Sequence, residues 1–369
     1  MDEETQEKRV RGKGTGSLFF ALGQDINERL WTAPTSNRMN FVACFLVLLA
    51  GTGSDHRLTK WSAKACEEHI GIGKPRAKLA IEELIACGLV KRTADSSRMM
   101  PQYELPELPR EAEPTFLPVA LVTGLSGEAS MLRRVRETGD VLTLRMLVDL
   151  YGLVDTDATF GVPLSNLLGG RAEGNDTTAK KIATVGVHAV WAITEGTWRW
   201  ANGDWMVRHK AKGPKPYDEF WRRVDTLTQL GALWWEPWLF DCEDDGAEPI
   251  MPLDPAGYYS LSEPDDEARL TRLTFDVASA IVGDDRTYLF DKYEARYFIP
   301  LNLHRQAPAY RTVARLRVEA DTPGRRRAWA KRRRLVEDHL RGFTDLKADV
   351  DAGHLNKPMR LRSAEVGGM

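Results

Sequence analysis

The chain has 369 residues, of which 43% are hydrophobic and 28% are charged, a composition typical of a globular protein with about two to three domains. Its net charge of −2 excludes a uniformly cationic chain, so any surface for nucleic acid must be local. The four cysteines lack paired spacing, no stretch reaches about 18 apolar residues, and the N-terminus lacks the apolar segment of a signal peptide. We therefore expect a cytoplasmic location without a disulfide framework, a zinc site or a membrane-spanning helix.

The first residues lead into a domain that we predict at 17–105. Residues 1–16 combine mixed charge with glycine and contain no aromatic side chain, which predicts a disordered arm. We favour a solvated tail over the alternative, a basic arm that lies on phosphates. The segment from Phe19 to Leu30 is predicted to be a short helix that enters the domain.

The stretch from Met39 to Leu105 has the most regular pattern in the chain. Apolar residues at helical spacing predict a second amphipathic helix after a tight glycine turn, with Pro75 in its first turn and Gly88 at its end. The predicted elements are a helix at 41–50, a short strand at 57–60, a helix at 63–70, a turn at 71–73, a helix at 75–87, and strands at 89–93 and 100–105.

This order of elements resembles a winged helix-turn-helix DNA-binding domain. The resemblance is carried by the spacing of small and apolar residues on the second helix and after it, namely Ala77, Ala80, Ile81, Leu84, Gly88, Leu89 and Val90. It implies that the helix at 75–87 enters the major groove of double-stranded DNA.

The candidate DNA-binding residues of this domain lie on the helix start and on the ribbon. A recognition helix contacts bases from its N-terminal residues, so Arg76 suits guanine, whereas Lys74 and Lys78 suit phosphates. The ribbon adds Lys91, Arg92 and Arg98. A solvated charged face, or a winged helix that binds only protein, remains the alternative, which Glu82 and Glu83 favour.

The chain then continues through a proline-rich linker at 106–118, the predicted domain boundary, into a second domain at 119–241. We predict helices at 128–136, 141–154 and 162–168, a polar loop at 171–178, and strands at 185–207. Asn202-Gly203 predicts a hairpin rich in tryptophan.

A second copy of the opening pattern follows. Phe220, Val224, Leu227 and Leu230 predict a helix, Gly231-Ala232-Leu233 repeats the spacing seen after Leu84, and a strand is expected at 234–240. Two interpretations are open: a second winged helix at 140–241, or an unrelated α+β domain. Arg222 and Arg223 are its candidate DNA-binding residues, and Lys210, Lys212 and Lys215 add positive charge nearby.

The C-terminal third alternates in charge. We predict an acidic loop at 242–262, a helical and β region at 263–350 that includes a helix ending near Val282, and a disordered tail at 351–369. Seven of the ten residues from 325 to 334 are cationic. They are candidate phosphate contacts, namely Arg325, Arg326, Arg327, Lys331, Arg332, Arg333 and Arg334. The alternatives are a helix paired with the acidic stretch and a segment that folds on binding.

No catalytic constellation is present. The histidines do not form a metal-binding grouping, and no glycine loop has the sequence of a phosphate loop, so we expect neither an enzyme nor a cofactor. The predicted fold is mainly α with small β-ribbons (α+β), with two winged helix-turn-helix modules and a basic helical C-terminal region.

We therefore expect a sequence-specific protein that binds double-stranded DNA in the nucleoid. Two winged modules resemble initiators of plasmid replication, and the first module fits a transcriptional regulator of a plasmid or phage equally well. Further partners would be a second copy of the chain or a replication or transcription protein. The alternative from another class is an adaptor that docks a protein partner through its tryptophan-rich surfaces.

Overall fold

The computed structural model describes most of the chain. The described residues are 18–97, 99–108, 114–125, 127–154, 159, 161–163, 179–194, 216–242, 247–257, 265–283, 292–293, 295–302, 307–319 and 322–356. They belong to two compact units. Unit 1 lies within Met1–Val154, Arg208–Trp234 and Leu316–Arg326, and unit 2 lies within Asp155–Val207, Trp235–Arg315 and Arg327–Met369.

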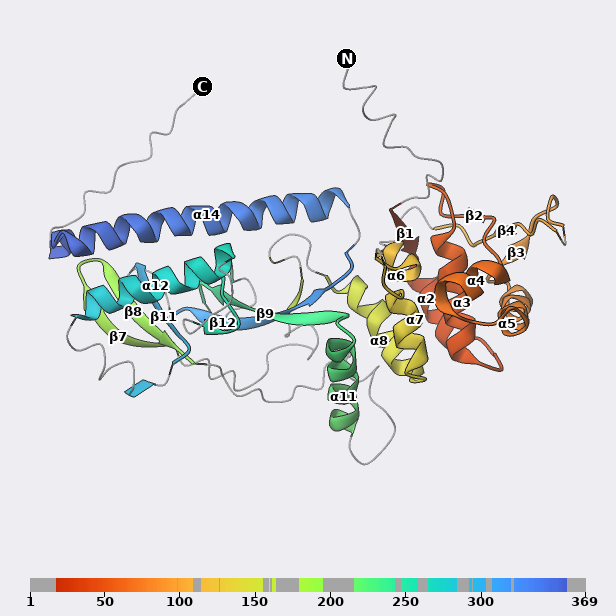
Figure 1. Cartoon of the computed structure of the whole chain (residues 1–369), viewed down its shortest axis with the longest axis horizontal. Helices are drawn as coiled ribbons and strands as arrows, with labels where there is room; N and C mark the ends of the chain where they lie inside the picture. The colour runs from red at the N-terminus through yellow and green to blue at the C-terminus, as the bar shows by residue number, and fades with distance from the viewer. Residues whose placement is uncertain are drawn as a thin grey trace, which may run out of the picture. The chain divides into compact units, whose positions relative to one another are not determined.

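Unit 1 is built around an apolar helix. Helix α3 (Arg38–Ala50) is buried along its whole length from Phe41 onward, as expected of a helix that is apolar on every side. Asn37 caps its start by accepting a hydrogen bond from the amide of Asn40. The other helices of this unit are α2 (Gln24–Thr32), α4 (Ala63–Ile70), α5 (Lys74–Ala86), α6 (Ala120–Thr123), α7 (Met131–Glu137), α8 (Val141–Gly152) and α11 (Pro216–Gln229) (Figure 1).

Two small antiparallel sheets complete unit 1. Strand β4 (Tyr103–Glu104) lies between β2 (Leu58–Thr59) and β3 (Lys91–Arg92), and β1 (Phe19–Leu22) pairs with β5 (Thr115–Pro118). The helices and the ribbon expected between 39 and 105 are therefore observed in the expected order.

The pairing of β1 with β5 corrects two predictions. Residues 19–22 form a strand rather than the start of a helix, and helix α2 begins only at Gln24. Residues 115–118 were assigned to a linker between domains, yet they form the partner strand, with Phe20 opposite Leu117. Proline at the end of an edge strand removes no ladder hydrogen bond, so the proline spacing does not prevent a strand here.

Unit 2 is a mixed structure of small antiparallel sheets and two long helices. One sheet has the order β10-β9-β12-β6 and the other has the order β11-β8-β7. Its elements are β6 (Val162–Pro163), β7 (Ala179–Val185), β8 (His188–Ile193), β9 (Leu233–Phe240), β10 (Pro249–Pro252), α12 (Asp266–Val282), β11 (Tyr297–Asn302), β12 (Ala309–Leu316), α14 (Pro323–Asp351) and the 3-10 turn η3 (His354–Asn356). Three of them, β9, β12 and α14, have one end in unit 1.

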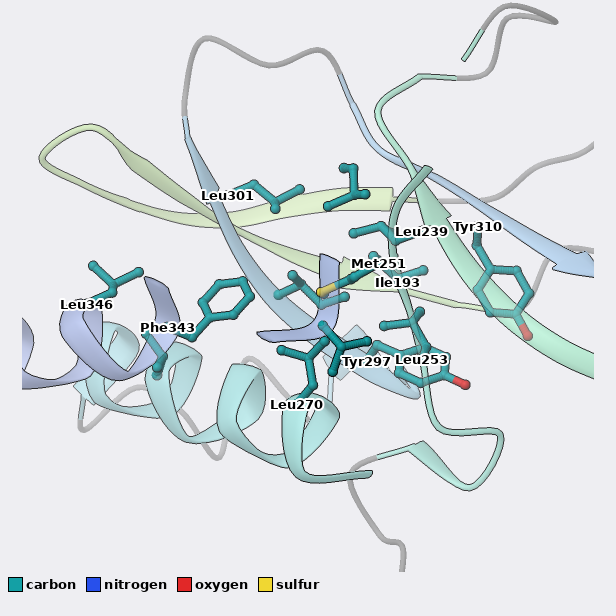
Figure 2. Packing of buried hydrophobic residues seen from close by; sticks show 14 residues of the cluster. Ile193, Leu239, Met251, Leu253, Leu270, Tyr297, Leu301, Tyr310, Phe343 and Leu346 are labelled. Atoms are coloured by element: carbon teal, nitrogen blue, oxygen red, sulfur yellow. The ribbon is translucent and has the colours of Figure 1, made fainter. Parts of the chain in front are cut away.

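The core of unit 2 joins both helices to the strands. Leu270 of α12 and Phe343 of α14 belong to one buried cluster with Tyr297 of β11 and Met251 of β10 (Figure 2). Alternate residues of β11 enter two different clusters, because Ile299 joins this core and Phe298 joins a smaller one with Val190. Both faces of this strand are therefore covered by apolar side chains.

Several predictions for 119–241 need correction. Val162–Pro163 is a strand rather than part of a helix, and β7 was not predicted. The segment expected to form a second winged module is divided between the two units, and β8 pairs with β7 and β11 rather than with β9. The expected helices at α7, α8 and α11 and the strand at β9 are present.

The remaining predictions fall partly outside the described residues. These include the arm at 1–16, the Asn202-Gly203 hairpin with Trp198, Trp200 and Trp205, the lysines at 210, 212 and 215, residues 243–246 and 258–262 of the acidic loop, and most of the C-terminal tail. The described part of the predicted acidic loop contains strand β10 at Pro249–Pro252, so this segment is not a loop throughout. None of the described helices combines the length and the apolar composition needed to cross a membrane.

Candidate functional site

The turn between α4 and α5 is fixed by its sequence. Ser62 caps α4 by accepting a hydrogen bond from the amide of Lys64, and Gly71 ends that helix with φ +68°, a conformation that glycine adopts without strain. Ile72 is buried within the turn, and Pro75 lies in the first turn of α5. The direction of α5 relative to α4 is thus set locally.

Helix α7, about sixty residues further along the chain, supports this turn from outside. The Ser130 hydroxyl donates to the carbonyl of His69 at 2.9 Å, and Arg136 Nε donates to the carbonyl of Ile70 at 2.9 Å. Both carbonyls belong to the last turn of α4, where no helical partner is available. Arg133 lies so close that a Cβ at Gly71 would meet its Nε at 3.3 Å.

Helix α5 has one buried face and one exposed face. Ala77, Ala80, Ile81 and Leu84 are buried, as the spacing predicted. Lys74, Arg76 and Lys78 are exposed near the helix start, and the first turn contains no acidic residue. Lys74 forms an ion pair with Glu67 at 3.2 Å, in which both side chains are about half exposed.

The end of α5 is anchored to its surroundings. Gly88 has φ +68°, as predicted, and the amide of Leu89 donates to the carbonyl of Leu84 at 3.0 Å. Glu83 accepts hydrogen bonds from Thr35 and from the amide of Ser36. Burial would raise the pKa of the Glu83 carboxyl, but these hydrogen bonds and the charge of Arg38 outweigh it and lower the pKa. Glu83 is therefore a structural acid.

The ribbon presents less free charge than expected. Lys91 is exposed, whereas Arg92 forms an ion pair with Glu82 on the outer face of α5. This pair neutralises Glu82 and leaves the positive charge at the helix start unopposed by that carboxylate. Arg98 lies outside the described residues.

Arg223 of α11 is buried against an acid of its own unit, which conflicts with a role in DNA contact, and exposed Arg222 pairs with the same acid. Arg223 is only 4% exposed and its Nε donates to Asp140 Oδ2 at 2.8 Å, while Arg222 donates to the same oxygen at 3.1 Å. Burial would raise the pKa of Asp140, but the charge and the hydrogen bond of Arg223 outweigh it and lower the pKa. Because Asp140 also caps α8 through the amide of Leu142, this cluster fastens α11 to α8.

The basic segment of α14 contains one residue that is not a candidate for phosphate contact. Arg332 is buried and donates to Glu236 Oε2 at 2.7 Å and to Glu267 Oε1 at 2.8 Å. Arg315, 1% exposed, donates to the same Glu236 oxygen at 2.6 Å, and the Trp238 indole donates to it at 2.8 Å. We call Glu236, Arg315, Arg332 and Trp238 the buried arginine cluster.

The acid of this cluster is held in its charged form. Burial would raise the pKa of Glu236, but the hydrogen bond from Arg332 and the charges of both arginines outweigh it and lower the pKa. The Arg332 guanidinium also lies 5.3 Å from the ring centres of Trp238 and Trp329. The alternative interpretation, in which the basic helix pairs with acidic residues, thus holds for Arg332, whose partner Glu267 lies in the first turn of α12.

The other cations of the segment differ in exposure. Arg325 is half-buried, and its Nε donates to Glu319 at 2.7 Å. The exposed members are Arg326, Arg327, Lys331, Arg333 and Arg334. Like charges this dense on one helix repel each other unless anions lie nearby.

Sequence reasoning missed the buried arginine cluster, although two signals were present. Arg332 lies four residues from both Ala328 and Val336, which are buried, so it falls on the core-facing stripe of α14. Glu236 is a single carboxylate in an otherwise apolar strand, LWWEPWLF, and a buried charge needs a partner.

The comparisons with known proteins found nothing: no family model, no curated protein and no solved structure matches the chain.

Proposed function

We propose that residues 38–105 form a winged helix-turn-helix that binds double-stranded DNA, with α5 in the major groove. The observation that carries the proposal is the exposed N-terminal part of α5, where Lys74, Arg76 and Lys78 project from a helix whose opposite face is buried. Because the first helical turns of such an element approach the base edges, these cations meet phosphates and purine acceptors.

Two further features of unit 1 support the proposal. The strand order β2-β4-β3 places a two-stranded ribbon directly after α5, which is the position of a wing. The ribbon carries exposed Lys91, and Glu82 on the outer face of α5 is neutralised by Arg92. A bound polyanion is therefore repelled little by Glu82.

In this proposal the exposed cations of α14, namely Arg326, Arg327, Lys331, Arg333 and Arg334, add contacts to phosphates. Such contacts carry no sequence information. Arg223 and Arg332 are left out because each is buried against a carboxylate. Arg222 is left out because its guanidinium pairs with two carboxylates, Asp140 and Glu219. The biological role that fits is a replication initiator or transcriptional regulator of a plasmid or phage.

The test is selection from a pool of random duplexes by the full chain, followed by sequencing of the bound fraction. We expect one motif to be enriched. The variant Arg76→Gln/Lys78→Gln should lose both the motif preference and most of its affinity, because it removes a base contact and a phosphate contact.

The matched control is Arg269→Gln/Lys347→Gln. It removes one arginine and one lysine, both in unit 2 and each paired with a neighbouring aspartate. This control should select the same motif as the parent. Absence of enrichment, or equal losses in the two variants, would reject the proposal and favour an adaptor that binds protein.

A further inference from the structure

The exposed face of α5 carries one large apolar side chain among charges. Leu79 is 56% exposed, while the other leucine of the helix, Leu84, is fully buried. Since side chains three residues apart on a helix are neighbours, Leu79 lies between Arg76 and Glu82 on the outward face. It plays no part in the core of unit 1.

A partner for Leu79 has to be small. A protein interface of ordinary size buries about 800 Å² on each side, and its centre is depleted of charged residues. The flanking positions of α5 are instead occupied by Arg76, Lys78 and Glu82, all exposed. The apolar surface here is one side chain wide.

The major groove offers an apolar group of this size. Each thymine presents a methyl group there, next to base edges that otherwise carry only hydrogen-bond donors and acceptors. A leucine one helical turn from an arginine matches this pattern, in which an apolar contact lies beside a purine that accepts bidentate hydrogen bonds.

We infer that Leu79 is a specificity-determining residue that packs against a thymine methyl group in the bound duplex. This inference rests on the proposed function of α5 and names the base that it selects near the guanine expected for Arg76. The Glu82–Arg92 ion pair keeps the neighbouring carboxylate neutralised beside that base pair.

The test replaces thymine by deoxyuridine, which removes only the methyl group. In duplexes with the selected motif, one position at a time would be changed to deoxyuridine, and affinity would be measured by fluorescence anisotropy. For the parent protein we expect a loss of about threefold to tenfold at one or two positions, the effect of uncovering one apolar group. Leu79→Ala should bind the thymine and deoxyuridine duplexes equally at those positions.

The control is Leu58→Ala, since Leu58 is 54% exposed on β2 of the same unit. It should keep the full preference for thymine over deoxyuridine. A parent protein that is indifferent to every deoxyuridine, or a Leu79→Ala variant that keeps the preference, would overturn the inference while leaving DNA binding intact. If no motif is selected, the proposed function itself fails.

Discussion

Glu236→Gln tests whether the buried arginine cluster holds α14 against the strands of unit 2. The substitution preserves the shape of the side chain but removes the negative charge that faces Arg315 and Arg332. It also turns an NH₂ group toward guanidinium donors. Glu236 accepts three hydrogen bonds of 2.6–2.8 Å through one oxygen, from both arginines and the Trp238 indole.

Removing one partner of a buried ion pair costs about 3–5 kcal/mol, because the remaining charge stays buried without compensation. Amide hydrogen exchange measured by mass spectrometry on the full chain localises this loss. Amides of β12 and of α14 from Arg327 to Leu340 should exchange about two to four powers of ten faster in the variant.

The comparison variant is Glu128→Gln, which breaks the ion pair of Glu128 with Arg317 at 2.8 Å. Both side chains of that pair are more than one-third exposed, so its loss should change stability by less than about 1 kcal/mol. If Glu236→Gln changed exchange in unit 2 no more than Glu128→Gln changes it in unit 1, the buried arginine cluster would not be what holds α14 against the strands.

Three further predictions follow from named contacts. The pKa of Glu236 lies below its ordinary value in the folded chain. The stability that ionised Glu236 adds to unit 2 is therefore complete above about pH 5 and is lost as pH falls through the folded pKa. Acid unfolding of unit 2, followed as a function of pH, should depend less on pH in Glu236→Gln than in the parent. Gly88→Ala should destabilise unit 1 by about 1–2 kcal/mol because Gly88 has φ +68°. Gly342→Ala within α14, where a Cβ meets nothing, should instead stabilise that helix. Equal effects of the two substitutions on stability would contradict a left-handed conformation at Gly88. Replacing Arg326, Arg327, Arg333 and Arg334 by glutamine should flatten the slope of log K against log salt by about two to four, whereas Arg332→Gln should lower the stability of unit 2. An unchanged slope in the first variant would remove α14 from the DNA-binding surface.

The parts of the fold that could be predicted are those specified by local pattern. Helix α5 follows from four apolar residues at helical spacing between Pro75 and Gly88, and each of these signals acts within a few residues. The ribbon of β3 and β4 likewise follows from a polar turn between two short β-prone runs.

The parts that could not be predicted depend on distant partners. Strand β1 pairs with β5 across almost one hundred residues, and nothing local in FFAL distinguishes a strand from a helical turn. The division of 140–241 between two units is a property of long-range packing, which a repeated spacing such as Leu227 to Leu233 does not specify.

The candidate site shows the same division. The exposure of Arg76 and Lys78 follows from the buried stripe of the helix that carries them. Arg223 and Arg332 are buried because they pair with Asp140 and Glu236, which are distant in sequence. A run of cationic residues alone therefore does not distinguish buried, paired arginines from exposed ones.

The Arg76→Ala variant tests whether α5 recognises bases, because it can be compared with the parent on cognate and random duplexes. Affinities of the parent and the variant for the selected motif and for a shuffled duplex would be measured at one fixed salt concentration. We predict a loss of about 1–3 kcal/mol on the motif and a much smaller loss on the shuffled duplex, with relaxed preference at one base pair. Equal losses on both duplexes would contradict base recognition by α5 and reduce Arg76 to a phosphate contact.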